Sequence, residues 1–217
     1  KESVWEGVSK TIVNLTPIRA RKNPITHVAI QSIHNKNKIA IKMRWEDPTP
    51  DSILKNKYVD QSAIQFAIGN INIRDSPFYG MGEKNKPVNI WHWKADIRQK
   101  IIQNTESGTN QNGQLFDSTS RMFLNPFNES PVEEINSKGI GTLTVQPLKD
   151  QQLEGRGYWQ NGRWNVIFIR DLETLSKWDI SFTVKRKVLL AFALWDGDKK
   201  DMNANKMVSF WQILSLQ

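Results

Sequence analysis

Short runs in which apolar and polar residues alternate recur along the chain, separated by turn-forming residues. In the clearest run, residues 38–47 (KIAIKMRWED), four apolar residues from Ile39 to Trp45 alternate with charged ones, with Ala40 as the exception. A period of two residues is typical of a strand that is buried on one face. Similar runs, dominated by β-branched and aromatic residues, cover residues 62–70, 87–96, 139–148, 162–172, 179–187, 187–196 and 206–216. These runs predict a mainly β protein, an antiparallel β-sandwich.

Helical patterns are weaker than strand patterns. In residues 95–104, ADIRQKIIQN, the isoleucines follow helical spacing and predict a short surface helix. From residue 105 the composition turns to Gly, Asn, Gln, Ser and Thr, and two prolines precede residue 137. We expect a long central loop over residues 105–137, because so long a stretch without a strand or helix pattern is usually functional or disordered. The sequence has no internal repeat and no sharp boundary, so we expect one domain over residues 1–217.

The charge and the missing cysteines narrow the function. The chain has 30 basic and 22 acidic residues, for a net charge of +8, but its lysines and arginines are scattered. Scattered basic residues favour an acidic protein surface as partner over nucleic acid. Because the chain has no cysteine, it has no disulfide, no thiolate zinc site, no iron–sulfur cluster of its own and no thioether-linked c-type haem. Any metal on this chain must therefore be bound by His, Met, Lys or carboxylate ligands.

Membrane and export signals are few. The longest apolar run, residues 188–195, is far shorter than the roughly 20 residues that cross a bilayer as a helix, so we expect no membrane span. The sequence starts with KESVWEG and has no initiator methionine. This start suggests either a trimmed chain or a mature one whose export signal has been removed, and the second case predicts a periplasmic or equivalent extracytoplasmic compartment.

The sequence gives little support for an enzyme. The three histidines are far apart, without a nucleophile elbow or an H-E-x-x-H motif, and Gly80-Met81-Gly82 lacks the context of a phosphate loop. Asp47, Asp51 and Asp60 could gather around calcium, but EF-hand spacing is absent. We therefore expect these three carboxylates to be solvated at strand ends.

Nine tryptophans lie in or beside the predicted strands. Three uses are open for so many indoles: filling the core of a sandwich, stacking on sugars in a carbohydrate-binding module, or lining the site of a large flat cofactor.

The order of five motifs favours the third use. The motifs are WEDPTPD, YVDQSAIQF, SPFYGMGEKNKPVNIWHWKAD, GRGYWQNGRWNVIFIRDL and LLAFALWDGDKKDMNANKMVSFWQIL. Together they resemble the haem b-binding gamma subunits of periplasmic molybdenum enzymes: ethylbenzene dehydrogenase, dimethylsulfide dehydrogenase, chlorate and selenate reductases and nitrite oxidoreductases. The resemblance runs from about Trp5 to Leu214. Its most specific parts are G-M-G followed by W-x-W, and A-F-A-x-W-D-G followed by K-M-V-S-F-W.

The resemblance implies one non-covalent haem b, held between the thioether of Met81 and the amine of Lys206. Gly80 and Gly82 would let the backbone approach the cofactor, and the resemblance adds two cofactor-binding tryptophans, Trp91 and Trp93. A lysine ligand must be neutral, which burial favours. Other residues could take the place of one ligand: Met202, Met207, Lys199, Lys200 and His92.

Two axial ligands leave iron no open position, so the implied role is electron transfer without catalysis. The expected partners are the iron–sulfur (beta) and molybdenum (alpha) subunits of a heterotrimer, together with a soluble cytochrome c. The Lys- and Asn-rich composition is compatible with a nitrite oxidoreductase. The alternative is a cofactor-free carbohydrate-binding β-sandwich, since a fold does not decide a function.

Overall fold

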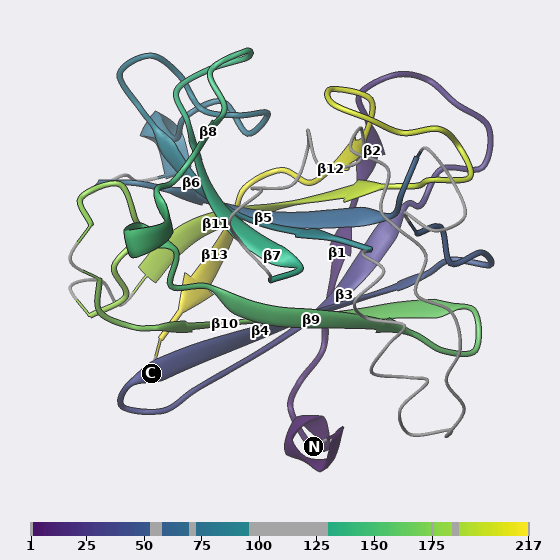
Figure 1. Cartoon of the computed structure of the whole chain (residues 1–217), viewed down its shortest axis with the longest axis horizontal. Helices are drawn as coiled ribbons and strands as arrows, with labels where there is room; N and C mark the ends of the chain where they lie inside the picture. The colour runs from purple at the N-terminus through teal and green to yellow at the C-terminus, as the bar shows by residue number, and fades with distance from the viewer. Residues whose placement is uncertain are drawn as a thin grey trace.

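The computed structural model describes residues 2–52, 58–69, 73–95, 130–174, 176–183 and 187–216. These residues form two antiparallel sheets that lie face to face, as Figure 1 shows, which confirms the predicted β-sandwich. The described helical segments are 3-10 turns, namely η1 (Glu2–Trp5), η2 (Ile73–Asp75) and η4 (Leu148–Asp150). No helix within the described ranges combines the length and the apolar character that crossing a membrane requires.

The first sheet has five strands. Their order is β1 (Thr11–Asn14), β3 (His27–His34), β4 (Lys38–Glu46), β10 (Arg163–Asp171) and β9 (Glu154–Trp159). The alternation predicted for residues 38–47 is confirmed, since the residues from Ile39 to Trp45 that were expected inside are buried. Lys42, on the opposite face of β4, is also buried, and its amine lies 5.7 Å from the ring centroid of Trp5.

The second sheet has eight strands. Its order is β2 (Thr16–Pro17), β12 (Met207–Val208), β11 (Lys187–Trp195), β5 (Gln61–Ala67), β6 (Val88–Lys94), β7 (Val132–Ser137) and β8 (Thr144–Val145), and β13 (Gln212–Ser215) pairs with β11 beside β12. Strand β7 lies within the stretch predicted as loop, so that prediction is wrong at its end. The apolar pattern did not reveal this strand, because two glutamates and an asparagine occupy it. These polar side chains form ion pairs and hydrogen bonds within the fold.

Other predictions for the central region lie outside the described residues. The helix expected at 95–104 does so except for its first residue, and so does the expected loop through residue 129.

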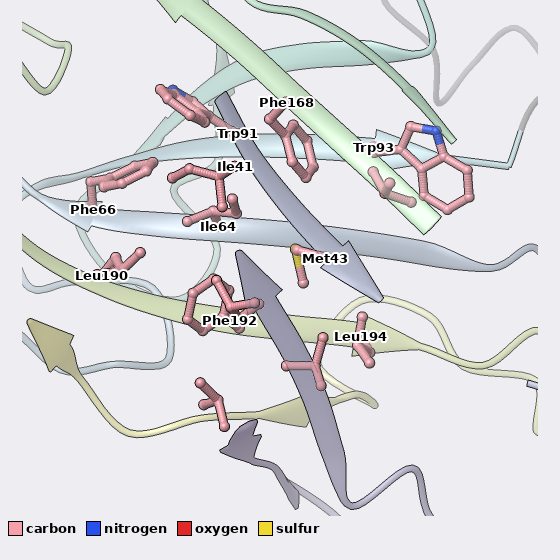
Figure 2. Packing of buried hydrophobic residues seen from close by; sticks show 14 of the residues in the cluster. Ile41, Met43, Ile64, Phe66, Trp91, Trp93, Phe168, Leu190, Phe192 and Leu194 are labelled. Carbon is pink, nitrogen blue, oxygen red and sulfur yellow. The ribbon is translucent and has the colours of Figure 1, made fainter. Parts of the chain in front are cut away.

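The core fills the space between the two sheets. Figure 2 shows side chains of both sheets interleaved in this layer, among them Ile41 of β4 and Phe66 of β5. Trp91 packs against Phe66 with ring centroids 4.6 Å apart, and Trp93 packs against Trp164 at 4.9 Å. Burial of such aromatic rings dominates the stability of a core, and truncating one to alanine typically costs about 3–5 kcal/mol.

A buried ion pair joins the two sheets inside this core. Nη1 of Arg170 on β10 lies 3.0 Å from Oε1 of Glu134 on β7, and both side chains are fully buried. The guanidinium lies over Trp91, 5.1 Å from its ring centroid. Burial raises the pKa of the Glu134 carboxyl, and the charge of Arg170 opposes this rise. Sequence periodicity gave no indication of this pair.

Three predicted strands differ from the structure. Of residues 139–148, only Thr144–Val145 (β8) form a strand. Residues 179–183 contain no strand. Ile180 and Phe182 enter the core from a crossing segment whose backbone bonds to Leu172 O and Arg170. Residues 206–216 form two strands. They separate at Ser209, whose hydroxyl accepts a hydrogen bond from Phe192 N at 2.9 Å.

Candidate functional site

The second sheet has an outer face that points away from the core. Because side chains alternate along strands, this face carries every second residue of the central strands β5, β6 and β11. A second apolar cluster, separate from the core, forms there from Ala63, Val88, Ile90, Ile135 and Trp195, with Ala193 and Trp211 packed against it. The small side chains of Ala63 and Ala193 are paired in register. They leave the middle of this face flat.

The loop with the Gly-Met-Gly motif folds over one part of the outer face. Its Tyr79 carbonyl accepts a hydrogen bond from Nε2 of Gln65 on β5 at 3.0 Å. The Met81 carbonyl accepts two more, from Ser137 Oγ at 2.8 Å and from Gly139 N at 3.0 Å. Met81 has φ = 127°, a backbone conformation that strains a residue with a side chain. The hydrogen bonds hold Met81 in this strained geometry, which is a common property of functional sites.

The two glycines of the motif are buried and fit their places closely. A Cβ on Gly80 would lie 2.5 Å from a ring carbon of Phe78. Gly82 has φ = 76°, and a Cβ there would approach the Lys86 carbonyl to 3.0 Å. A side chain at either position would displace the loop. The glycines therefore help to fix the position of Met81, and the approach of their backbone to a cofactor stays a prediction.

Lys206 reaches the same outer face from the other motif. It precedes Met207, which enters the core and pairs with Leu194 of β11, so the lysine points the opposite way. Its side chain is 7% exposed, and Nζ lies 4.8 Å from the ring centroid of Trp195. Burial lowers the pKa of the amine to about 8. No carboxylate within the described ranges forms an ion pair with Lys206.

A hydrogen-bonded turn holds the chain that leads to Lys206. The Asp201 carboxylate accepts from the Asp196 backbone at 3.0 Å, from Arg21 at 2.5 Å and from the Asn205 side chain at 2.9 Å. The Trp195 indole donates to the Asn203 carbonyl at 3.0 Å. These contacts fix the approach of the lysine to the sheet.

The two motifs touch although about 130 positions separate them. The Trp211 indole donates to the Pro77 carbonyl at 2.7 Å, and the rings of Tyr79 and Phe210 meet at 5.1 Å. Along β5, Gln65 lies under the methionine loop, and Gln61, which pairs with Trp195, lies in the row of Lys206. The two rows are four residues apart, which is roughly 13 Å of strand. The structure thus brings the loop of Met81 and the amine of Lys206 to one face.

His92 lies on this face but has both ring nitrogens occupied. Nδ1 lies 2.9 Å from Glu133 Oε1, and Nε2 lies 3.0 Å from Gln61 Oε1. Burial lowers the pKa of the imidazole, and the charges of Lys94 and Lys206 lower it further against the opposing effect of Glu133. Other groups therefore hold both ring nitrogens of His92, so it is a weaker ligand candidate than Lys206.

The other ligand candidates are also poorly placed. Met207 is buried in the core, while Met202 is 41% exposed at the surface. Lys199 and Lys200 are exposed, and the Lys199 amine pairs with Asp198.

Trp91 and Trp93, expected beside a cofactor, lie fully buried in the core on the face of β6 opposite to His92. The structure brings neither indole to the face with Met81 and Lys206. Their role here is packing between the sheets, and contact with a cofactor stays a prediction that this placement does not favour.

The expected solvated carboxylates are a clear correction. Asp47, Asp51 and Asp60 are buried, instead of facing water at strand ends. Asp51 and Asp60 lie close to Asp196, and the charge of Asp196 raises the pKa of Asp47. Sequence spacing missed this because the fourth residue is about 140 positions away.

The donor set of the outer face fits a haem held by methionine and lysine. Ligation needs a neutral amine, and desolvation already favours that form in Lys206. A thioether in a fixed loop supplies a soft ligand, and the apolar cluster offers a surface for a porphyrin. Met81, Lys206, Gly80 and Gly82 are thus the described residues that would hold the group.

Comparison with known proteins identifies the family of the chain. The sequence model of the ethylbenzene dehydrogenase family matches residues 2–206. The chain is 24% identical over 190 residues to chlorate reductase subunit gamma of Ideonella dechloratans, covering 86% of this chain and 64% of that protein. It is 26% identical over 194 residues to dimethylsulfide dehydrogenase subunit gamma of Rhodovulum sulfidophilum, covering 86% and 58%.

A third relative is named for a haem. It is a candidate respiratory nitrate reductase heme subunit, ORF7, of Haloferax mediterranei, 24% identical over 194 residues, with 88% of this chain and 56% of that protein covered. The chain therefore spans less than two thirds of the length of these three relatives.

Among solved structures, a family 9 carbohydrate-binding module of Caldicellulosiruptor kristjanssonii in complex with cellotriose matches with a TM-score of 0.44 at 11% identity, covering 96% of this chain and 74% of that one. So low a structural similarity supports no conclusion about function. The match of the family model over nearly the whole chain does decide the family. The chain belongs to the ethylbenzene dehydrogenase family, as its motifs predicted.

Proposed function

We propose that the chain is a non-catalytic electron-transfer subunit that carries one non-covalent haem b between Met81 and Lys206. The observation that carries this proposal is the buried amine of Lys206, which lies on one face with the strained Met81 loop and has a pKa lowered to about 8. A lysine of this kind is costly in a structural role, because a buried ammonium without a carboxylate is poorly solvated. The cost is explained if the neutral amine is a ligand.

The relatives support the role of a subunit in a larger complex. Two are named gamma subunits of chlorate reductase and dimethylsulfide dehydrogenase, and a third is named a heme subunit. We assign this chain the same place, beside an iron–sulfur (beta) and a molybdenum (alpha) subunit in an extracytoplasmic compartment such as the periplasm. It relays single electrons between the iron–sulfur subunit and a soluble cytochrome c, and nitrite oxidoreductase is our choice of parent complex.

The residues of this chain tune such a relay. When bound, the haem supplies a one-electron ferric/ferrous couple. The Met81 thioether would favour the ferrous state and raise the potential, and the Lys206 amine would supply the second ligand from this chain. The Trp195 ring and the apolar cluster exclude water from the amine. This arrangement suits electron transfer and does not suit catalysis.

Haem reconstitution of the purified chain tests the proposal. We expect one equivalent of haem, a Soret band with low-spin visible bands, and complete extraction of the pigment by acid–acetone, since the chain has no cysteine to attach it. Lys206→Ala should give a high-spin spectrum at pH 7, whereas the matched control Lys200→Ala should keep the wild-type spectrum. A chain that stays colourless with excess haem, or a Lys206→Ala spectrum identical to wild type, would contradict the proposal.

A further inference from the structure

Four aspartates from separate stretches of the chain meet at one end of the sandwich. Asp47 follows β4 of the first sheet, Asp60 precedes β5 of the second sheet, Asp196 follows β11, and Asp51 lies in the connection between β4 and β5. One carboxylate oxygen each from Asp51, Asp60 and Asp196 lies within 4.8 Å of the other two. All four residues are buried. The group therefore connects both sheets.

Hydrogen bonds hold three of these carboxylates in place. Asp60 Oδ2 accepts from the Asp51 backbone at 2.7 Å and from the Trp164 indole at 2.9 Å, and its Oδ1 accepts from Gly197 N at 2.9 Å. Thr49 bridges two other members. Its backbone donates to Asp47 Oδ1 and its hydroxyl to Asp51 Oδ2, each at 3.1 Å.

One oxygen in the group has no hydrogen-bond donor. Asp47 is only 1% exposed, and its Oδ2 makes no hydrogen bond within the described structure. The Trp45 indole lies close enough to lower the pKa of Asp47, but its N–H makes no hydrogen bond of acceptable geometry. Asp47 lies near the other acids, because its charge raises the pKa of Asp60, and the charges of Asp196 and Asp51 raise its own pKa. An unsatisfied buried carboxylate oxygen is costly and points to a missing partner.

That partner is not a basic side chain of the described residues. None of their lysines and arginines forms an ion pair with Asp47, Asp60 or Asp196, and the Lys199 amine pairs with the exposed Asp198. Burial, together with the neighbouring acids, raises the pKa of Asp47 to about 7 and that of Asp60 to about 8.

We propose that Asp47, Asp51, Asp60 and Asp196 bind a calcium ion that joins the two sheets and fixes the turn leading to Lys206. Calcium accepts six to eight oxygen ligands in flexible geometry, which carboxylates and backbone carbonyls supply, whereas magnesium demands a stricter octahedron. Gly197 makes room for the group, since a Cβ there would lie 2.5 Å from Asp51 Cβ and 2.9 Å from the Tyr58 carbonyl oxygen. The site is structural and does not depend on the proposed haem.

Two measurements on the full chain, after removal of metal with a chelator, test this site. Calcium should raise the thermal unfolding temperature in a saturable way, and more than magnesium at equal concentration. Terbium should show luminescence excited through tryptophan, because the Trp164 indole donates directly to Asp60. Calcium should then quench this luminescence by competition.

Variants decide which residues hold the ion. Asp47→Asn keeps the shape of a side chain whose Oδ2 has no donor, and Asp60→Asn removes the central carboxylate. Each should lower calcium affinity by about tenfold or more. Asp198→Asn, in the same turn but exposed, should leave it unchanged. If Asp60→Asn does not fold, Asp47→Asn and wild-type terbium titration suffice. Absence of saturable terbium binding and of a calcium effect on wild type, or Asp47→Asn with wild-type affinity, overturns the proposal.

Discussion

The Lys206 amine is the group in which a loss of folding stability is most closely linked to the proposed function. Its pKa of about 8 means that at pH 7 most of the free chain carries a buried ammonium. Ligation of iron must release this proton. We therefore expect haem affinity to rise by about tenfold per pH unit below pH 8 and to level off above it. Haem titrations between pH 7 and 9 measure this, and the Lys206→Ala variant should lack the rise. His92 does not interfere, because its lowered pKa keeps it neutral in this range.

The same lysine should destabilise the haem-free chain. The pKa of the buried amine is lower than its value of 10.5 in the unfolded chain, so the folded state binds fewer protons and stability rises with pH. The penalty is complete below pH 8, shrinks between pH 8 and 10.5, and vanishes above. At pH 7 it amounts to about 3 kcal/mol. Urea unfolding of haem-free Lys206→Leu should show a gain of this order at pH 7 that is lost by pH 11. A loss of stability at pH 7 would contradict a buried ammonium.

Met81 combines a strained backbone with a thioether, and the two effects can be separated. Met81→Ala keeps the strain but removes sulfur, so in the haem-loaded chain the potential should fall and the low-spin spectrum should be lost. Met81→Gly also removes the strain at φ = 127°, so it should be the more stable of the two without haem. The exposed Met202→Ala is the matched control. An unchanged spectrum in Met81→Ala would place the ligand elsewhere.

Between elements, the site depends on a contact of the Gly-Met-Gly loop with the segment before β13. The hydrogen bond from Trp211 Nε1 to the Pro77 carbonyl ties the loop of one proposed ligand to the chain that carries the other. Trp211→Phe keeps most of the ring but removes the donor, at a cost of about 1 kcal/mol. We expect a small loss of stability and a faster release of haem, measured by transfer to a haem-scavenging globin. The exposed Trp178→Phe should change neither rate nor stability.

The strands themselves show what a sequence can and cannot reveal. The one-sided burial of β4 was readable because its apolar residues recur every second position, and periodicity records burial directly. Ile180 and Phe182 have the same pattern but lie in a crossing segment, since their partners are fixed by distant residues. The position of Met81 and Lys206 on one face was not readable from periodicity either. Motif order named the two residues, whereas register, loop contacts and the pKa of the amine needed the fold.

At the scale of the whole molecule, the buried ion pair that stabilises the fold and the candidate site lie in different layers. Arg170 and Glu134 join the sheets inside the core, while Met81 and Lys206 lie on the outer face of one sheet. Removing one member of a buried ion pair leaves an uncompensated charge and typically costs about 3–5 kcal/mol, whereas replacing both with apolar residues is often neutral. The two kinds of change should therefore be distinguishable in one protein.

A double-mutant cycle on the ion pair tests this separation. Arg170→Met and Glu134→Leu should each lower the free energy of unfolding by about 3–5 kcal/mol, and the double variant should lose much less than their sum. Because the core does not contain the proposed ligands, each variant that still folds at low temperature should keep the low-spin haem spectrum and the wild-type potential. Denaturant unfolding gives the energies, and spectroelectrochemistry gives the potential. A high-spin spectrum in the folded double variant would mean that the core ion pair positions the haem, and that the two layers are not independent.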